Sequence, residues 1–216
     1  MPPKFTYLRD PAAIAEESLR VAREEADLSR LPGEAHDLAL QLVQACGMPD
    51  ILNDLRCSQD AIAAGMAALR RGAPILCDSE MVAHGIGRTA LPVGTKVICR
   101  LNHPQVASLA ERQGSNRAAA QVDLWDDVLD GAVVAIGEAP TALFRLLERL
   151  DGGAPRPALV IGFPCGLVGA ADAKAELGAN QLGVPFIALA GRRGGSALAA
   201  AAVNALARPL ASSPSA

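Results

Sequence analysis

Aromatic residues and excess positive charge are both scarce in this chain. Only 3% of the 216 residues are Phe, Trp or Tyr, and the formal net charge at pH 7 is −3. Proteins that bind nucleic acids usually carry a basic surface that neutralises phosphates, and those that bind single strands add aromatic side chains that stack on bases. The composition therefore argues against nucleic acid as a partner.

Motifs for metal binding and disulfide formation are absent as well. The five cysteines, Cys46, Cys57, Cys77, Cys99 and Cys165, lie far apart, form no C-x-x-C pair and have no histidine at ligand spacing. An odd number of dispersed cysteines is not typical of a zinc site or a disulfide scaffold. We therefore expect free thiols, no metal and a reducing, cytoplasmic environment.

Long apolar segments are missing too. No uninterrupted apolar run approaches the roughly 18 residues of a membrane span, and residues 1–5 lack the apolar core of a signal peptide. We expect no membrane association. Half of the residues are apolar, which is enough for one sizeable core. The expected organisation is a single domain over residues 1–210 with a flexible tail over 211–216.

Three helices are expected at the start of the chain. Asp10 precedes a proline, as is typical of an N-cap and first turn, and residues 11–23 carry one apolar stripe. A second helix is expected over residues 33–46, ending at Gly47, and a third over residues 58–71.

Five short apolar runs follow these helices. They cover residues 75–77, 97–99, 133–136, 159–161 and 186–189. Apolar runs without alternation are typical of parallel strands that are covered on both faces. The spacing between the runs leaves room for crossover helices. The sequence therefore predicts an α/β fold: a Rossmann-like, doubly wound, mostly parallel sheet with helices on both faces, preceded by the N-terminal helices.

Polar side chains gather directly after the first of these runs. Asp78, Glu80, His84 and Arg88 follow residues 75–77. Ligands of open α/β sheets bind in the crevice outside the carboxyl ends of the strands, so this segment is a candidate site. The alternative is a strand, a turn and a capped helix without chemistry.

Several strands end in a glycine-rich turn that opens a helix. These turns cover residues 136–141, 161–166 and 189–196, and residues 115–117 open another helix. Free N–H groups and the helix dipole make such turns, taken together, suitable for a ligand with several carboxylates, although for each turn taken singly packing is the favoured explanation. None matches the dinucleotide fingerprint or the P-loop, so no nucleotide cofactor is expected.

The three histidines are the side chains that titrate near neutral pH without perturbation. His84 follows the acidic pair and is a candidate acid or base, or simply a satisfied polar residue near a strand end. We expect His36, on a charged helical surface, and His103, in a loop before a proline, to be solvated.

A series of motifs along the chain resembles a single family in order and spacing. The motifs are Tyr7–Asp10, Glu25–Leu28, Ala45–Gly47, Pro74–Arg88, Val134–Gly137, Ala139–Phe144, Val168–Ala171, Gly194–Ala197 and Asn204–Leu206. From Tyr7 to Pro209 the chain resembles the precorrin-8X methylmutase family, also called precorrin isomerase, of corrin biosynthesis.

This resemblance implies both a fold and a reaction. It implies a Rossmann-like homodimer, with sites shared between subunits, that moves a methyl group from C-11 to C-12 of precorrin-8X and gives hydrogenobyrinate on the route to cobalamin. The reaction is a shift within the ring and needs no cofactor. The acidic arms of the corrin-type substrate would pair with arginines and helix N-termini.

The resemblance also indicates the site residues. Ser18 and Arg117 match binding positions of the family, and Gln44 stands at the position of its catalytic histidine. The residues expected to bind substrate are Ser18, Gln41, Arg88, Ser115, Asn116, Arg117, Gly194, Gly195 and Ser196.

Four positions depart from the family pattern. Gln44 replaces the histidine proposed as proton donor, Gln41 replaces a substrate-facing arginine, Glu138 replaces asparagine and Asn116 replaces threonine. Glutamine does not titrate near pH 7, but its amide still donates a hydrogen bond. Three hypotheses remain open: a methylmutase with impaired acid catalysis, a diverged paralogue that binds a corrin or other tetrapyrrole, and an isomerase of a different tetrapyrrole.

Overall fold

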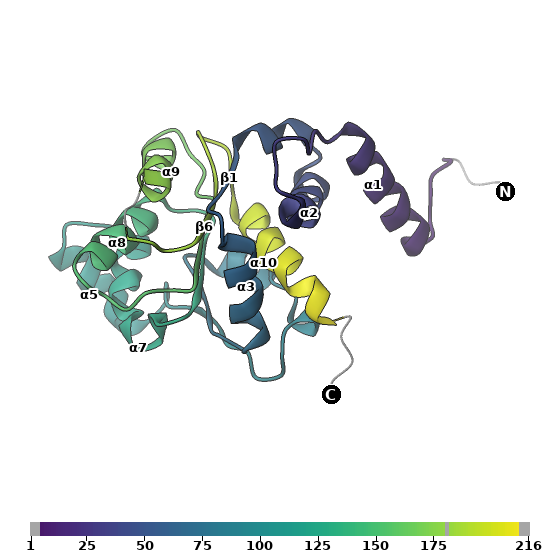
Figure 1. Ribbon diagram of the computed structural model, residues 1–216. Coiled ribbons are helices and arrows are strands. Elements are labelled where there is room, and N and C mark those ends of the chain that lie inside the picture. Colours follow the sequence, from purple (N-terminus) through teal and green to yellow (C-terminus); the bar gives the residue numbers. More distant parts are fainter. Residues whose placement is uncertain (1–4, 180–181, 212–216) are drawn as a thin grey trace.

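The structure is a computed structural model that describes residues 5–179 and 182–211. Its elements alternate along the chain as the apolar runs predict (Figure 1). The α-helices are α1 Pro11–Glu25, α2 His36–Cys46, α3 Ala61–Arg70, α4 Glu80–Gly85, α5 Pro104–Arg112, α6 Arg117–Ala120, α7 Asp126–Leu129, α8 Pro140–Asp151, α9 Ala170–Ala179 and α10 Ser196–Ala211. The strands are β1 Leu55–Cys57, β2 Ile75–Cys77, β3 Val97–Cys99, β4 Val133–Ile136, β5 Leu159–Gly162 and β6 Phe186–Leu189. Short 3-10 helices are η1 Gly33–Ala35, η2 Pro49–Asp54, η3 Arg88–Ala90 and η4 Gln121–Leu124.

The strands form one six-stranded sheet in the order β1-β6-β5-β4-β2-β3. The five strands expected from the sequence pair in parallel, and β1 pairs with β6 in the antiparallel direction. The sequence analysis missed β1, because its three residues include Arg56 and form no apolar run. An edge strand needs little apolar surface, so composition gives no signal for it.

Helices cover both faces of the sheet, which confirms the expected fold class (Figure 1). Successive residues of a strand point to opposite faces. Ile75 and Cys77 therefore join the core formed with α2, α3 and α10, whereas Leu76 joins the core formed with α8 and α9. Helix α1 lies outermost, against α2, and of its residues only Ala22 is buried (Figure 1).

The observed helix boundaries have local causes. The Asp10 carboxylate accepts a hydrogen bond from the N–H of Ala13, so α1 begins where the N-cap signal places it. Gly47 ends α2 with φ of 68°, a conformation that favours glycine. The third helix begins at Ala61 rather than at Ser58, because Ser58 pairs with the backbone of Phe186 and extends the β1 ladder.

The last helix runs one residue into the segment expected to be a tail. Helix α10 ends at Ala211, and residues 212–216 lie outside the described part of the chain. The division into a domain over 1–210 and a tail stays a prediction.

Candidate functional site

The strand order reverses between β2 and β4. From β2 the chain passes to β3 on one side, and it returns to β4 on the other side. A ligand of a doubly wound sheet is expected at such a switch point, outside the carboxyl ends of the two strands. In this protein the two ends are Asp78 and Gly137.

The Asp78 carboxylate itself occupies the switch point. Its Oδ1 accepts a hydrogen bond from the N–H of Gly137 at 2.9 Å, and its Oδ2 accepts from the N–H groups of Glu138 at 2.9 Å and Ala139 at 2.7 Å. Asp78 is only 1% exposed. Burial raises the pKa of Asp78, and the three N–H donors act in the opposite direction. The N–H groups of the turn before α8 therefore bind the Asp78 carboxylate of the protein itself. The sequence analysis had considered them as donors to a ligand.

A buried glutamine completes the surroundings of Asp78. The Gln121 side chain donates from Nε2 to the Asp78 carbonyl at 2.7 Å and accepts from the Arg100 N–H at 3.0 Å. Gln121 is fully buried. Because both ends of this amide are satisfied, the segment after β3 is fixed to the segment after β2.

The turn between β6 and α10 packs closely on the end of β5. The Gly195 N–H donates to the Phe163 carbonyl at 2.8 Å, and a Cβ on Gly194 would lie 2.1 Å from the same oxygen. The hydroxyls of Ser196 and Ser79 lie 3.4 Å apart in a buried position. These contacts give Gly194, Gly195 and Ser196 a packing role, and their contact with a substrate stays a prediction.

A second hydrogen-bond and ion-pair network holds the turn between β6 and α10. The buried ammonium of Lys174 in α9 donates to the Arg193 carbonyl at 2.6 Å, and burial lowers the pKa of Lys174 to about 8. The Arg193 guanidinium pairs with Asp50 at 2.6 Å and with Asp54 at 2.7 Å, and both carboxylates lie in η2. The sequence analysis missed this network, because its members come from three separate segments.

Arginine side chains and amides surround the carboxyl end of β3. Arg117 donates from Nη2 to the Leu101 carbonyl at 2.9 Å and to Asn102 at 3.3 Å. The Asn116 side chain caps α6 by accepting from the Ala119 N–H at 3.0 Å. These bonds leave Nη1 and Nε of Arg117 without a partner among the described residues.

Two further predicted residues, Arg88 and Ser115, are exposed. Arg88 is exposed at the start of η3, next to Gly87, whose N–H donates to the Asn204 side chain at 2.8 Å. Ser115 is exposed directly before the Asn116 cap. Arg88, Ser115 and Arg117 therefore remain available to a ligand.

The structure joins Ser18, Gln41 and Gln44 in one hydrogen-bonded chain between α1 and α2. Gln41 donates from Nε2 to the Gln44 Oε1 at 2.7 Å, and Gln44 donates from Nε2 to the Ser18 hydroxyl at 3.2 Å. These three residues form a group separate from the arginines at the sheet edge, since no hydrogen bond between described residues connects the two. The site predicted from the sequence thus falls into two parts.

The histidines lie away from this chain of hydrogen bonds. The His84 side chain is 81% exposed, and its Nδ1 lies 2.7 Å from the Glu80 carbonyl of its own helix. His103 is exposed, as expected, and caps α5. His36 is only half-exposed and lies 3.2 Å from the Leu31 carbonyl, which corrects the expectation that it is solvated.

Two absences apply to the residues that the structure describes. In residues 5–179 and 182–211, no three His, Cys, Asp or Glu side chains gather as a metal site would require. Within the same ranges no helix is long and apolar enough to cross a membrane.

Comparison with known proteins identifies the family. The family model described as precorrin-8X methylmutase matches residues 13–209. The chain belongs to the precorrin-8X methylmutase family. A protein of Pseudomonas aeruginosa named precorrin-8X methylmutase is 53% identical over 93% of this chain and 97% of its own length. A protein of the same name from Sinorhizobium sp is 52% identical, over 96% of this chain and 99% of its own length.

Solved structures agree with this assignment. The crystal structure of precorrin-8X methylmutase from Thermus thermophilus has a TM-score of 0.84 and 38% identity, covering 93% of this chain and 97% of that one. Methylmutases of this family are isomerases of cobalamin biosynthesis, and this chain is such an enzyme by family.

Replacing Asp78 tests whether its carboxylate holds the switch point. In Asp78→Asn an NH2 group faces at least one N–H donor of the turn before α8, so a buried donor loses its acceptor. We expect the free energy of unfolding, measured by urea denaturation, to fall by about 1–3 kcal/mol. The control is Asp60→Asn, an exposed carboxylate that does not cap α3. Equal stabilities of the two variants would contradict this role.

Replacing Gly194 tests the close packing of the turn before α10. In Gly194→Ala the new methyl group collides with the Phe163 carbonyl, and backbone cannot move aside as a flexible side chain can. We expect a loss of about 1–3 kcal/mol in the free energy of unfolding. Gly33→Ala, whose methyl group meets no atom within 4 Å, should leave stability nearly unchanged. A stable Gly194→Ala protein would show that the turn has room for a ligand.

Proposed function

We propose that this enzyme moves the methyl group of precorrin-8X from C-11 to C-12 and releases hydrogenobyrinate. The observation that carries the proposal is the identity of 53% and 52%, over nearly the whole chain, to two proteins named precorrin-8X methylmutase. Relatives named cobalt-precorrin-8 methylmutase, such as those of Leptospira interrogans and Priestia megaterium, reach only 30% and 32%. This difference supports the metal-free substrate.

The amide of Gln44 would hold the macrocycle rather than protonate it. Its Oε1 accepts from Gln41 and its Nε2 donates to Ser18, so both ends of the amide already take part in directed hydrogen bonds. An amide has no proton to transfer near neutral pH. The chain of hydrogen bonds orients Gln44 and Ser18 toward substrate, and the acid catalysis of an imidazole is lost.

The acidic arms of the substrate would be bound at the edge of the sheet. Arg117 has two guanidinium nitrogens that bond no described residue, and Arg88 forms no ion pair within the described residues. A guanidinium presents a planar pair of donors that matches a carboxylate. Ser115 and Asn116 directly precede Arg117 and would add neutral hydrogen bonds, together with N–H groups near Gly194.

The active unit would be a homodimer with shared sites. Exposed apolar side chains at the carboxyl edge of the sheet, Met81, Leu167 and Val168, offer a surface for a partner or a macrocycle. Ser196 and Arg208 stand at opposite ends of α10, about 18 Å apart along the helix axis. This separation of the two parts of the site supports a site completed by a second copy. The five free cysteines fit a cytoplasmic location.

A second function is favoured by one specific observation. Gln44 stands where the family resemblance places a proton donor, and no histidine among the described residues contacts it. A protein that binds the corrin precursor without isomerising it would retain every other feature of the site.

Visible spectra separate the two functions. Purified protein incubated with precorrin-8X should convert it to the orange product, and a catalytic amount of protein should convert all of it. Stoichiometric binding without conversion would support the binding protein. An unchanged spectrum would contradict both functions.

Restoring an imidazole tests the role of Gln44. Gln44→His should raise turnover, by as much as roughly 10²-fold, because general acid catalysis becomes available. The rate should depend on a group that titrates near pH 6.5. The matched control is Gln41→His, which places the same ring one turn earlier in α2. If Gln44→His is no faster than the parent protein, this position does not donate the proton.

Mixed dimers test whether the sites are shared. Ser18→Ala and Arg117→Ala should each weaken binding of hydrogenobyrinate, the latter by about 1.5–3 kcal/mol. When the two variants are co-expressed, a site that takes one residue from each protomer is intact once per mixed dimer. A titration should then recover a fraction of sites with the parent affinity. Two weakened sites and no recovery would place each site within one protomer.

A further inference from the structure

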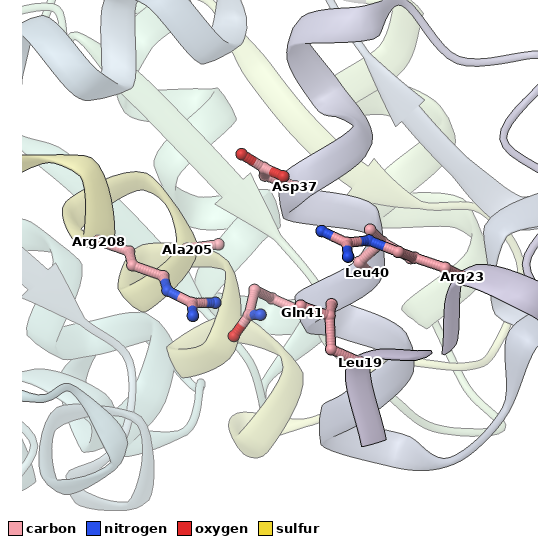
Figure 2. Close-up of a pocket in the computed structure, with 7 residues that line it drawn as sticks. All are labelled: Leu19, Arg23, Asp37, Leu40, Gln41, Ala205 and Arg208. Carbon is pink, nitrogen blue, oxygen red and sulfur yellow. The ribbon is translucent and has the colours of Figure 1, made fainter. Parts of the chain in front are cut away.

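A separate cavity lies between α1, α2 and α10. Its volume is about 440 Å³ (Figure 2). The residues that line it are Leu19, Arg23, Asp37, Leu40, Gln41, Ala205 and Arg208. Leucine and alanine side chains provide the apolar part of the lining, and two arginines from distant parts of the sequence provide positive charge. Of these seven residues, only Gln41 was expected at the substrate site.

Neither arginine of this cavity has a partner among the described residues. Helix α1 shows the contrast clearly: Arg20 pairs with Glu17 at 2.6 Å and also with Glu24, whereas Arg23 forms no ion pair or hydrogen bond in the described ranges. Arg208, in the last turns of α10, likewise has no described partner. Figure 2 shows Arg208 reaching from α10 toward the Gln41 amide, and Arg23 reaching in from the side of α1.

The charge of this cavity differs from that of its neighbour on the other side of the α1–α2 contact. The neighbouring cavity, of about 270 Å³, is lined by Ser18 and Gln44 together with Glu17 and Glu25, and by no arginine. The arginine cavity contains one carboxylate, Asp37, which in Figure 2 lies apart from Arg208 and Gln41. Two guanidiniums outweigh this carboxylate, so a carboxylate arm of a ligand is favoured in the arginine cavity, whereas the cavity beside Glu17 and Glu25 suits an uncharged part of the macrocycle.

The arginine cavity adjoins the catalytic position. Gln41 lines the cavity and donates to Gln44, which in turn donates to Ser18. A ligand group bound by Arg208 and Gln41 therefore lies one hydrogen bond away from Gln44. Since a guanidinium presents two parallel N–H donors, the matching group on a ligand is a carboxylate.

We propose that Arg23, Gln41 and Arg208 form a subsite for one carboxylate arm of the macrocycle, separate from Arg117 at the edge of the sheet. The inference rests on the proposed function, because the carboxylate belongs to the corrin substrate. Asp37 acts against binding in this subsite. The subsite takes its arginines from α1 and α10, and Gln41 connects it to Gln44 and Ser18.

Titration with hydrogenobyrinate, followed by visible absorbance, tests the subsite. Arg23→Ala and Arg208→Ala should each raise the Kd roughly tenfold or more, as expected for lost charge-assisted hydrogen bonds. Arg208→Lys keeps the charge but loses the planar donor pair, so its Kd should lie between those of Arg208→Ala and the parent. Arg112→Ala, an exposed arginine of α5 without a described ion pair, is the control and should bind like the parent.

Removing the opposing charge gives a test in the other direction. Asp37→Asn should lower the Kd several-fold, and raising the NaCl concentration should weaken binding to the parent more than binding to Arg23→Ala. A purely structural role for the arginines predicts neither result. Thermal unfolding of each variant shows whether the fold is retained, and Arg208→Lys carries the test if Arg208→Ala does not fold.

The outcomes separate this subsite from the proposed function itself. If the parent protein does not bind hydrogenobyrinate, the corrin function fails. If the parent binds but the Kd is unchanged in Arg23→Ala, Arg208→Lys and Asp37→Asn, the subsite is wrong and the corrin function stands.

Discussion

One buried carboxylate, that of Asp78, occupies the usual ligand position of this fold. Asp78 ends β2 and accepts three hydrogen bonds from the backbone that begins α8, with contacts of 2.7–2.9 Å. Those N–H groups are the usual anion site of a doubly wound sheet. In this protein the Asp78 side chain already accepts hydrogen bonds from these N–H groups. The carboxylate therefore connects β2 to the start of α8 and occupies the place that a phosphate or a substrate carboxylate would take.

The remaining polar groups are arranged around this closed centre. Gln121, Asn204 and Lys174 each hold a loop of the carboxyl edge by bonding backbone carbonyls or N–H groups. These bonds fix the segments that present Arg88 and Arg117 without using the arginines themselves. The Ser18–Gln44–Gln41 chain instead lies on the outermost helices, where Ala22 is the one buried residue of α1 and Leu19 packs against the core while partly exposed. Because so little of α1 is buried, a shift of α1 toward a ligand at Ser18 and Arg23 would break few packing contacts.

The sequence predicts structure well where neighbouring residues determine it. It does not predict contacts between side chains and backbone groups that are far apart in the chain. Unbroken apolar runs predicted all five parallel strands, since both faces of the sheet are buried, as Ile75 on one face and Leu76 on the other illustrate. The role of Asp78 was not predictable in the same way. Nothing local shows whether the N–H groups of residues 137–139 meet a ligand or a side chain some 60 positions earlier in the chain. The position of Arg208 in a cavity was not predictable for a related reason, because the cavity forms only when α1, α2 and α10 pack together.

The two glutamines of α2 are best understood as a pair. In the family pattern that this chain resembles, positions 41 and 44 carry arginine and histidine, so two potentially cationic groups stand one helical turn apart. Here Gln41 donates to Gln44 at 2.7 Å, an arrangement that requires an acceptor at position 44 and no charge at either position. A residue at position 44 that cannot accept a hydrogen bond would leave the Gln41 donor without this partner, which couples the two positions. With both neutral, positive charge next to the catalytic position has to come from outside α2, and Arg23 and Arg208 lie in the cavity that Gln41 lines.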